Sequence, residues 1–411
     1  MTISNSNTGP LLPHRSGPPG KEDLICYSHL RWNFVFQRPQ HLLSRCARLR
    51  RVFFFEEPVF DAAAPRLEIN TDPSGVHVVV PHLPQQTDVA AQRQELRELL
   101  DELIRTYAIR DHIAWYYTPM ALGFSDHLRP RVMVYDCMDE LSAFAGAPMG
   151  LRAAEHELMQ RADLVFTGGV SLYEAKRRLR PQVHAFPSSV DVPHFAQARR
   201  ITTEPADQGG VPHPRLGFFG VVDERFDRPL LARAASLRPD WHFMILGPIV
   251  KIDQATLPHA PNIHYLGQKA YAELPAYIAG WDVALLPFAR NEATRFISPT
   301  KTPEYLAAGK PVVSTSIRDV VRPYGESGVV HIADSPEDFV VAAEAAMAED
   351  PVERQAKVQR LLEGISWDRT WADMHDLIVR AAARTHPEPA EGRPATSRAR
   401  GTQVDPPPAT A

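Results

Sequence analysis

The sequence predicts an α/β protein made of two Rossmann-like domains, each a doubly wound parallel sheet, facing each other across a cleft. Its 411 residues exceed the size at which a single core keeps growing. Short apolar runs alternate with amphipathic stretches in two separate series, which is typical of parallel sheets with helices on both faces. A Pro- and Gly-rich passage, ITTEPADQGGVPHP, separates the two series.

The first series predicts a domain over residues 21–195. Its expected strands are DLICYSHL, RVFFFE, VHVVVP, IAWYYTP, VMVYDCM and DLVFTGG, and its expected helices include PQHLLSRCARL, VAAQRQELRELLDELIRTYA and LRAAEHELMQRA. Each strand run is short and rich in β-branched or aromatic residues, whereas the helical stretches repeat their apolar residues every three or four positions. Ligands of such sheets bind beyond the carboxyl ends of the strands, so the loops after those ends are the expected site.

The second series predicts a domain over residues 215–365, after a linker at 196–214. Its expected strands are RLGFFGVV, HFMILGP, IHYLG, DVALLPF, PVVSTS and GVVHIA. A final helix at 366–383 is expected to bury Trp367, Trp371, Met374 and Leu377, packing back on the first domain. Residues 1–20 and 384–411 are rich in Pro, Gly and polar residues and are expected to be disordered.

The composition excludes several classes of protein. A formal net charge of −4 gives no overall reason to expect nucleic-acid binding. The 3 cysteines are too few for a disulfide framework, and the 17 histidines include no HExxH spacing, so no metal and no cofactor are expected. The sequence shows no leader pattern and no long apolar run, which favours a cytoplasmic protein. The basic cluster Arg45, Arg48, Arg50 and Arg51 leaves peripheral membrane contact open.

The most informative segment is SPTKTPEYLAAGKPVVST, residues 298–315, where a polar loop leads from a strand into a helix. Thr302 is expected to cap this helix, Pro303 to occupy its first position and Gly309 to end it. Backbone amides at a helix start favour phosphate, and Lys301 adds a positive charge there. Glu304 has the acceptor geometry for a vicinal diol such as a ribose. The alternative is that Glu304 only complements the helix dipole and that Lys301 is a solvated surface residue.

The stretch ISPTKTPEYLAAGKPVV, with PNIHYLGQKAYAELPAYIAGWDVALLPF before it, resembles the donor-binding half of GT-B glycosyltransferases, especially bacterial family-4-like enzymes that build surface polysaccharides. The resemblance implies that Glu304 binds the nucleotide ribose and that the preceding residues, Ser298, Thr300, Lys301 and Thr302, face the diphosphate of a UDP- or GDP-linked sugar. It also implies a glycan or polyprenyl-linked acceptor.

The resemblance extends into the first domain. ADLVFTGGVSLYEAKRRL followed by FPSSVDVPHF is similar to the end of the family's first domain, and HLRWNFVFQRPQHLL resembles the opening of one subgroup. The latter implies that Arg38, Gln40 and His41 lie near the interdomain cleft.

The sequence also departs from the family pattern. An acid eight positions before Glu304 is replaced by Phe296. The family's Arg and Lys phosphate clamp falls on Val221 and Asp227, which leaves Arg225 or Arg228 as substitutes and makes Lys301 the better phosphate candidate. Gly220 fits a position where the backbone approaches phosphate closely, although a glycine after a strand also makes turns.

In the first domain, VYDCMDELSAF places Asp136, Asp139 and Glu140 just beyond a strand. A direct displacement needs a base for the acceptor hydroxyl, and Asp139 is the candidate catalytic residue. The alternative is that Asp139 caps a helix that starts at Leu141.

The sequence therefore predicts a glycosyltransferase that moves a sugar from a nucleotide diphosphate sugar to a hydroxyl acceptor. A GT-B-type nucleotide-sugar epimerase and a non-catalytic nucleotide-sugar-binding protein remain alternatives. An NAD-dependent oxidoreductase is disfavoured because no GxGxxG follows the first strand.

Overall fold

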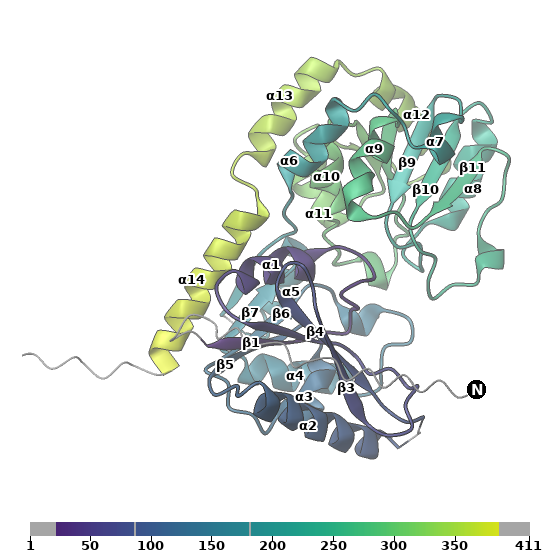
Figure 1. Cartoon of the computed structure of the whole chain (residues 1–411). Helices are drawn as coiled ribbons and strands as arrows, with labels where there is room; N and C mark the ends of the chain where they lie inside the picture. The colour runs from purple at the N-terminus through teal and green to yellow at the C-terminus, as the bar shows by residue number, and fades with distance from the viewer. Residues whose placement is uncertain (1–21, 86–87, 181, 386–411) are drawn as a thin grey trace, which may run out of the picture.

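The computed structural model describes residues 22–85, 88–180 and 182–385, which form two α/β domains (Figure 1). The segments expected to be disordered, 1–20 and 384–411, lie outside the described residues except for positions 384 and 385, which end the last helix. No helix among the described residues has the length and apolarity needed to cross a membrane.

The first domain contains a sheet of eight strands in the order β3-β4-β2-β1-β5-β6-β7-β8. Their bounds are β1 Asp23–Tyr27, β2 Val52–Phe55, β3 Arg66–Thr71, β4 Val76–His82, β5 His112–Tyr116, β6 Val132–Cys137, β7 Leu164–Thr167 and β8 Val183–Ala185. All neighbours are parallel except β3, which runs antiparallel to β4 at the edge. Strand β3 was not expected from the sequence: it has no buried residue, and its two apolar residues, Leu67 and Ile69, are only half-buried against the core.

Alternation along each central strand sends side chains to two separate cores. In β1, Ile25 and Tyr27 face a core that includes residues of helices α2 and α4, whereas Leu24 and Cys26 face one that includes residues of α1 and α14. The helices of this domain are α1 Arg38–Ala47, α2 Val89–Thr106, α3 Leu122–Ser125, α4 Leu151–Arg161 and α5 Val170–Lys176. Burial on both faces explains why these strands are nearly continuous apolar runs.

The second domain contains a fully parallel sheet in the order β11-β10-β9-β12-β13-β14. Its strands are β9 Arg215–Phe219, β10 His242–Leu246, β11 Ile263–Gly267, β12 Val283–Leu286, β13 Val312–Ser314 and β14 His331–Ile332. Its helices are α8 Arg228–Leu237, α9 Leu274–Ala279, α10 Lys301–Ala307, α11 Arg318–Val320, α12 Pro336–Met347 and α13 Pro351–Leu362. The six strands are those expected from the apolar runs.

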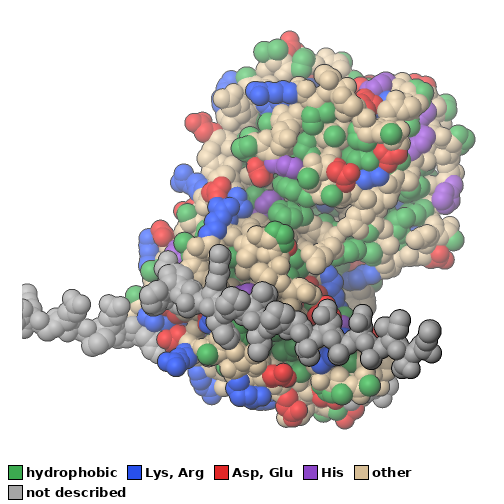
Figure 2. All heavy atoms as spheres, viewed as in Figure 1, with side chains coloured by type: hydrophobic (Ala, Val, Ile, Leu, Met, Phe, Trp, Pro, Cys, Tyr) green, Lys and Arg blue, Asp and Glu red, His purple; other side chains and the backbone are tan. Residues whose placement is uncertain are grey.

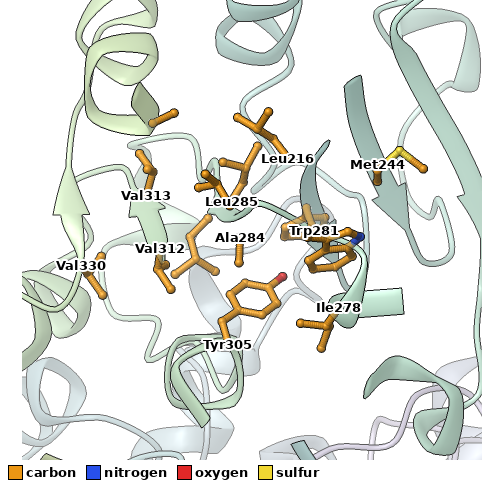
Figure 3. Close-up of a cluster of buried hydrophobic side chains, with 14 of the residues drawn as sticks. Leu216, Met244, Ile278, Trp281, Ala284, Leu285, Tyr305, Val312, Val313 and Val330 are labelled. Carbon is orange, nitrogen blue, oxygen red and sulfur yellow. The ribbon is translucent and has the colours of Figure 1, made fainter. Parts of the chain in front are cut away.

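One side of the second sheet is packed around Trp281 and Tyr305, which lie near Leu216 and Ala284 of the central strands (Figure 3). A side chain at Gly217 would meet the Trp281 ring at 2.0 Å, so glycine in β9 makes room for the indole. The Tyr305 hydroxyl accepts a hydrogen bond from the amide of Phe219 at 3.0 Å. This packing fixes helix α10 against the end of strand β9.

Residues 196–214, expected as a linker, contain two short helices, Ala196–Arg199 and α7 Ala206–Gly209. The Gln208 side chain is buried, donating to the Tyr277 carbonyl at 2.9 Å and accepting from the Trp281 indole at 3.0 Å. This segment therefore packs as part of the second domain rather than spanning a gap between domains.

The last helix, α14 Trp367–Thr385, returns to the first domain and lies alongside it (Figure 1). Trp367, Trp371, Met374 and Ile378 are buried in the core that contains the β1 residues Leu24 and Cys26. Leu377, expected on the buried side, is only half-buried, because Ile378 occupies the next inward position of the helix. Helix α14, the last element that the structure describes, thus leads from the second domain back to the first.

Candidate functional site

A cavity of about 730 Å³ lies where the carboxyl ends of the two sheets face each other. The first domain contributes the loop after β1, residues 32–37, together with Gln40 and Ser44 of α1 and the 72–74 turn. The second domain contributes loops after β9, β10 and β11 and the start of α10: Phe219, Gly220, Val221, Arg225, Leu246, Gly247, Pro248, Gln268, Lys269, Ala270, Tyr271, Leu274, Thr300, Lys301 and Glu304. Both domains build this cavity.

Helix α10 begins two residues earlier than the sequence indicates. It starts at Lys301 with Thr300 at the N-cap position, so the expectation that Thr302 caps it and Pro303 is its first residue is wrong. Thr302 is fully buried, its hydroxyl has no hydrogen-bond partner, and it does not line the cavity. The expected end is right: Gly309 has φ +82°, and its amide donates to the Leu306 carbonyl at 2.9 Å.

Glu304 forms part of the cavity wall and is only 5% exposed. Its Oε2 atom is buried with no hydrogen-bond partner among the described residues. Burial raises the pKa of this carboxyl to about 7, and the nearby Lys301 opposes that rise. An acid that only complements the helix dipole can stay in solvent, where water satisfies its hydrogen bonds. Glu304 is instead buried, and its Oε2 atom lacks a hydrogen bond until a ligand supplies a donor.

Lys301 extends from the start of α10 beneath the end of β9. Its ammonium lies 5.8 Å from the Phe218 ring centroid and 5.9 Å from that of Phe219. A side chain at Gly220, which has φ +139°, would come within 2.1 Å of the lysine Cε, so glycine leaves the space that the lysine occupies. Burial lowers the pKa of Lys301, while Glu304 opposes that effect.

Arg225 also reaches the cavity, where it is held by a neighbouring acid. It forms a bidentate ion pair with Asp223, with Nη2 at 2.7 Å from Oδ2, and its guanidinium lies 5.2 Å from the Phe144 ring of the first domain. Arg228 instead donates to the hydroxyl of Thr256 outside the cavity. Asp227, at the family's lysine position, caps helix α8 through the Leu230 amide. Of the two arginines considered from the sequence, only Arg225 lines the cleft.

Ser298 and Thr300 line a smaller cavity of about 100 Å³ that also contains Asp139, Arg225 and Lys301. The Ser298 carbonyl accepts a hydrogen bond from the Ser188 hydroxyl of the first domain at 3.0 Å. The predicted donor residues other than Thr302 therefore lie together at the domain interface.

Asp139 lies half-buried in the loop after β6 and lines two cavities. The second of these has a volume of about 420 Å³ and also contains His29 and Phe144 of the first domain and Lys251 of the second. Burial raises the pKa of Asp139, which Arg225 counteracts. The short helix Leu141–Ala143 has Glu140 at its N-cap position and no side-chain cap, so Asp139 is not a cap.

The neighbouring acids of Asp139 are committed to structural ion pairs. Asp136 is fully buried and receives two hydrogen bonds from Arg38, at 2.9 and 3.0 Å. Glu140 pairs with Lys176 at 2.7 Å. Among the acids after β6, Asp139 is thus the one that faces the cleft without such a partner in the described structure.

The three residues expected near the interdomain cleft also make structural contacts. Arg38 lines the 100 Å³ cavity, and its Nη1 atom donates to the Phe186 carbonyl at 2.8 Å. Gln40 lines the large cavity, and its amide donates to the Trp32 carbonyl at 2.6 Å and accepts from the Gln37 amide at 3.0 Å. Part of the hydrogen-bonding capacity of both side chains is therefore used within the first domain.

His41 lies at the domain interface but lines none of the cavities described above. Its ring stacks on Trp367 of α14 at 4.5 Å and meets Tyr271 of the second domain edge-on at 5.6 Å. Burial lowers its pKa to about 3, so the ring is neutral near pH 7. The sequence could not show this, because Trp367 is more than three hundred residues away in the chain.

A contact that the sequence did not indicate bridges the two domains above Asp139. The backbone amide of Ala145 donates to Glu224 at 2.9 Å, beside the Arg225–Phe144 contact. The loop 144–148 carries no charged residue and no apolar pattern, so nothing in it signals a site. It forms one wall of the 420 Å³ cavity.

Phe296, at the position of the family's acid, lies half-buried against the core of the first domain. The basic cluster considered for membrane contact is partly neutralised, because Arg45 pairs with Asp368, Arg50 with Glu22 and Arg51 with Asp23. On the face shown in Figure 2, basic and acidic side chains are interspersed.

Metal-ligating side chains do not gather in the described part of the chain: no three His, Cys, Asp or Glu residues converge there. The charged groups that line these cavities include Glu304, Lys301, Arg225, Asp223 and Asp139. Their chemistry suits a ligand with both anionic oxygens and hydroxyl groups.

Two Rossmann-like domains with such a cleft between them form the GT-B fold, and the solved structures agree on this fold. Sucrose-phosphate synthase from Thermosynechococcus elongatus superposes with a TM-score of 0.64 at 16% identity, covering 89% of this chain and 100% of that one. The Anabaena protein HepE, solved in complex with UDP and glucose, gives a TM-score of 0.64 at 15% identity, with 87% and 100% covered.

Residues 213–349 match the family described as Glycosyl transferases group 1. The protein TuaH of Bacillus subtilis (strain 168), named for teichuronic acid biosynthesis as a glycosyltransferase, is 28% identical over an alignment of 290 residues. The alignment covers 65% of this chain and 72% of TuaH. The protein is a glycosyltransferase, and its second domain carries the group 1 family region.

Proposed function

We propose that this glycosyltransferase moves a sugar from a UDP-linked donor to a hydroxyl of a glycan or lipid-linked acceptor in surface polysaccharide synthesis. The observation that carries the donor assignment is the buried, unpaired carboxylate of Glu304 beside Lys301 in the interdomain cavity. The UDP in the structure of HepE and the teichuronic acid in the name of TuaH support the nucleotide and the product class.

In this proposal the second domain holds the donor. Glu304 accepts hydrogen bonds from the ribose hydroxyls, and Lys301 and Arg225 face the diphosphate as its charge grows on departure of the sugar. Gly220, Ser298 and Thr300 bring backbone close to the same phosphates. The two cationic side chains provide the charge stabilisation, so we propose that transfer requires no metal ion or other cofactor.

The first domain is proposed to hold the acceptor in the 420 Å³ cavity. Asp139 reaches both this cavity and the one that contains Lys301, so a hydroxyl there lies between the base and the donor phosphates. Asp139 would take the acceptor proton as the new glycosidic bond forms and the bond to diphosphate breaks. The walls from both domains exclude water that would otherwise hydrolyse the donor.

Asp139→Asn tests this role, because asparagine keeps the size of the side chain and removes its basicity. We expect kcat to fall about 10²- to 10⁴-fold, the usual range for a general base, while donor affinity changes little. Asp126→Asn, on the exposed surface of the same domain, is the matched control. Wild-type turnover in Asp139→Asn would remove the aspartate from the mechanism.

A thermal-shift screen against UDP-, GDP- and ADP-linked sugars identifies the donor, since a bound ligand raises the melting temperature by mass action. The donor found is then incubated with and without candidate acceptors. Sugar transfer that depends on acceptor supports the proposal. Interconversion of the sugar nucleotide alone would indicate an epimerase, and binding with no turnover on any acceptor would indicate a sensor.

A further inference from the structure

A second cavity of the first domain, of about 290 Å³, lies beside the acceptor cavity. We propose that it binds a hydrocarbon chain attached to the acceptor, so that the enzyme glycosylates an amphipathic substrate whose sugar end reaches Asp139. This inference rests on the proposed function, because it extends the acceptor site described above.

The walls of this cavity, named here the chain cavity, are mainly apolar. They comprise Tyr27, Phe55, Pro58, Phe60, Val89, Leu96, Met120, Ala121 and Phe124, with Ser28, Glu56, Glu57, Gln92, Arg93 and Thr118 among them. The cavity lies at the carboxyl ends of β1, β2 and β5, under the first turns of α2. At about 30 Å³ for each small group, it has room for roughly ten methylene-sized groups.

The chain cavity adjoins the acceptor cavity: Glu57, Thr118 and Met120 line both. Asp139 lies on the wall of the acceptor cavity. An elongated molecule that passes these three shared residues would place a hydroxyl near Asp139 and its tail among the apolar side chains. This adjacency is the reason to assign the occupant to the acceptor rather than to a separate ligand.

The mouth of the chain cavity exposes large apolar side chains. Phe60 is 39% exposed and Val89, the first residue of α2, is 56% exposed. Leaving such side chains in water costs free energy, and two of them around one opening mark a site for an apolar ligand.

The chain cavity can be tested with two probes that share one sugar. We would titrate n-octyl β-D-glucoside, below its micelle concentration, and methyl β-D-glucoside into the full-length protein by calorimetry. Each fully buried methylene is worth about 0.8 kcal/mol, or about fourfold in affinity, so the octyl compound is expected to bind more than tenfold tighter.

Two variants test whether the octyl chain of octyl glucoside occupies the chain cavity. Val89→Asp puts a charge at the mouth, and Met120→Trp adds bulk to the wall that both cavities share. Both are expected to lower octyl glucoside affinity at least fivefold. Val352→Asp is the matched control, because Val352 is 76% exposed in the first turn of α13, which, like α2, follows an aspartate cap. It should bind octyl glucoside as the wild type does.

Equal binding of the two glucosides, or equal loss in Val89→Asp and Val352→Asp, would overturn the proposal. So would a dimer that Val89→Asp converts to monomers without change in octyl glucoside binding, because the apolar mouth would then be an interface between copies. Since these titrations contain no donor, they are independent of turnover. Failure of sugar transfer with all acceptors would refute the proposed function while leaving the binding result in place.

Discussion

Replacing Glu304 by glutamine is expected to stabilise the protein and at the same time to weaken its hold on the donor. The substitution keeps the shape of the side chain and removes a charge that is 95% shielded from solvent by the fold, since the residue is 5% exposed. Stability is expected to rise because the carboxylate lacks hydrogen bonds in the free protein. Donor affinity is expected to fall because the carboxylate gains hydrogen bonds from the ribose.

The gain in stability depends on pH in a defined direction. Burial raises the pKa of Glu304 to about 7, against an ordinary value of about 4.3. Below the ordinary value, the carboxyl is protonated in both folded and unfolded chains and costs nothing. As pH rises, the unfolded chain loses the proton first, so the wild type loses stability until the folded carboxyl also ionises near pH 7. Glu304→Gln lacks this loss, and its advantage should grow from about 1 kcal/mol at pH 5 to about 3 kcal/mol at pH 8.

Donor binding should change in the opposite way. A carboxylate that accepts hydrogen bonds from the ribose contributes about 2 kcal/mol more than a neutral amide, so donor affinity should fall about 30-fold in Glu304→Gln above pH 7. Because the donor favours the ionised form, wild-type affinity should weaken as pH falls below 7, by up to about tenfold for each pH unit. In Glu304→Gln the affinity should stay flat over the same range.

Urea unfolding at pH 5 and pH 8 measures the first effect, and calorimetric titration of the donor from pH 5 to pH 8 measures the second. Glu353→Gln is the control, since Glu353 is an exposed acid in the first turn of another helix, α13. It should change stability by less than about 0.5 kcal/mol. A Glu304→Gln protein that is less stable at pH 8, or that binds donor like the wild type, would refute the assignment.

Two further substitutions separate binding from structure. Gly220→Ala should weaken donor binding at least tenfold, because the new methyl overlaps the Lys301 side chain at a backbone φ of +139°. Donor titration checks this. Gly210→Ala is the control that should bind donor normally, because Gly210 has open space around it. Unchanged affinity would show that Lys301 does not face phosphate. Arg38→Met should lower the free energy of unfolding by about 3–5 kcal/mol, because it leaves the Asp136 carboxylate buried and unpaired; a change under about 1 kcal/mol in urea unfolding would contradict the structural role given to Arg38.

The strands of the second domain were predictable because each is buried on both faces and reads as a short apolar run. The same reasoning found six strands of the first domain but missed its two edge strands, β3 and β8. Strand β3 has no buried residue, and β8 has three residues of which one is buried, so neither forms a buried apolar run. Helix α10 was predicted with its C-terminal glycine in place. Its start was misplaced at Thr302, because the buried hydroxyl of that residue is packed by tertiary contacts rather than placed by local capping.

The residues of the candidate site also differ in how far the sequence predicted their position and contacts. Glu304 and Lys301 were found from the sequence because they share one short segment, and local order along the chain places them on one wall. Arg38 and His41 lie near the interdomain cleft as expected, but the sequence did not show their partners Asp136 and Trp367, which come from distant parts of the chain. A charged or aromatic side chain is available to a ligand only when no other residue of the folded protein already pairs or stacks with it.

The sequence by itself determined that the chain forms two parallel-sheet domains and that the segment 298–315 lies at a strand end of the second. These features follow from residue periodicity and local turn chemistry. Only the tertiary structure decided that the Glu304 carboxylate is buried without a partner, that Asp139 faces both cavities, and that a mainly apolar cavity lies beside the acceptor cavity. Burial and pairing depend on which distant segments the folded chain brings together, and one-dimensional patterns do not contain that information.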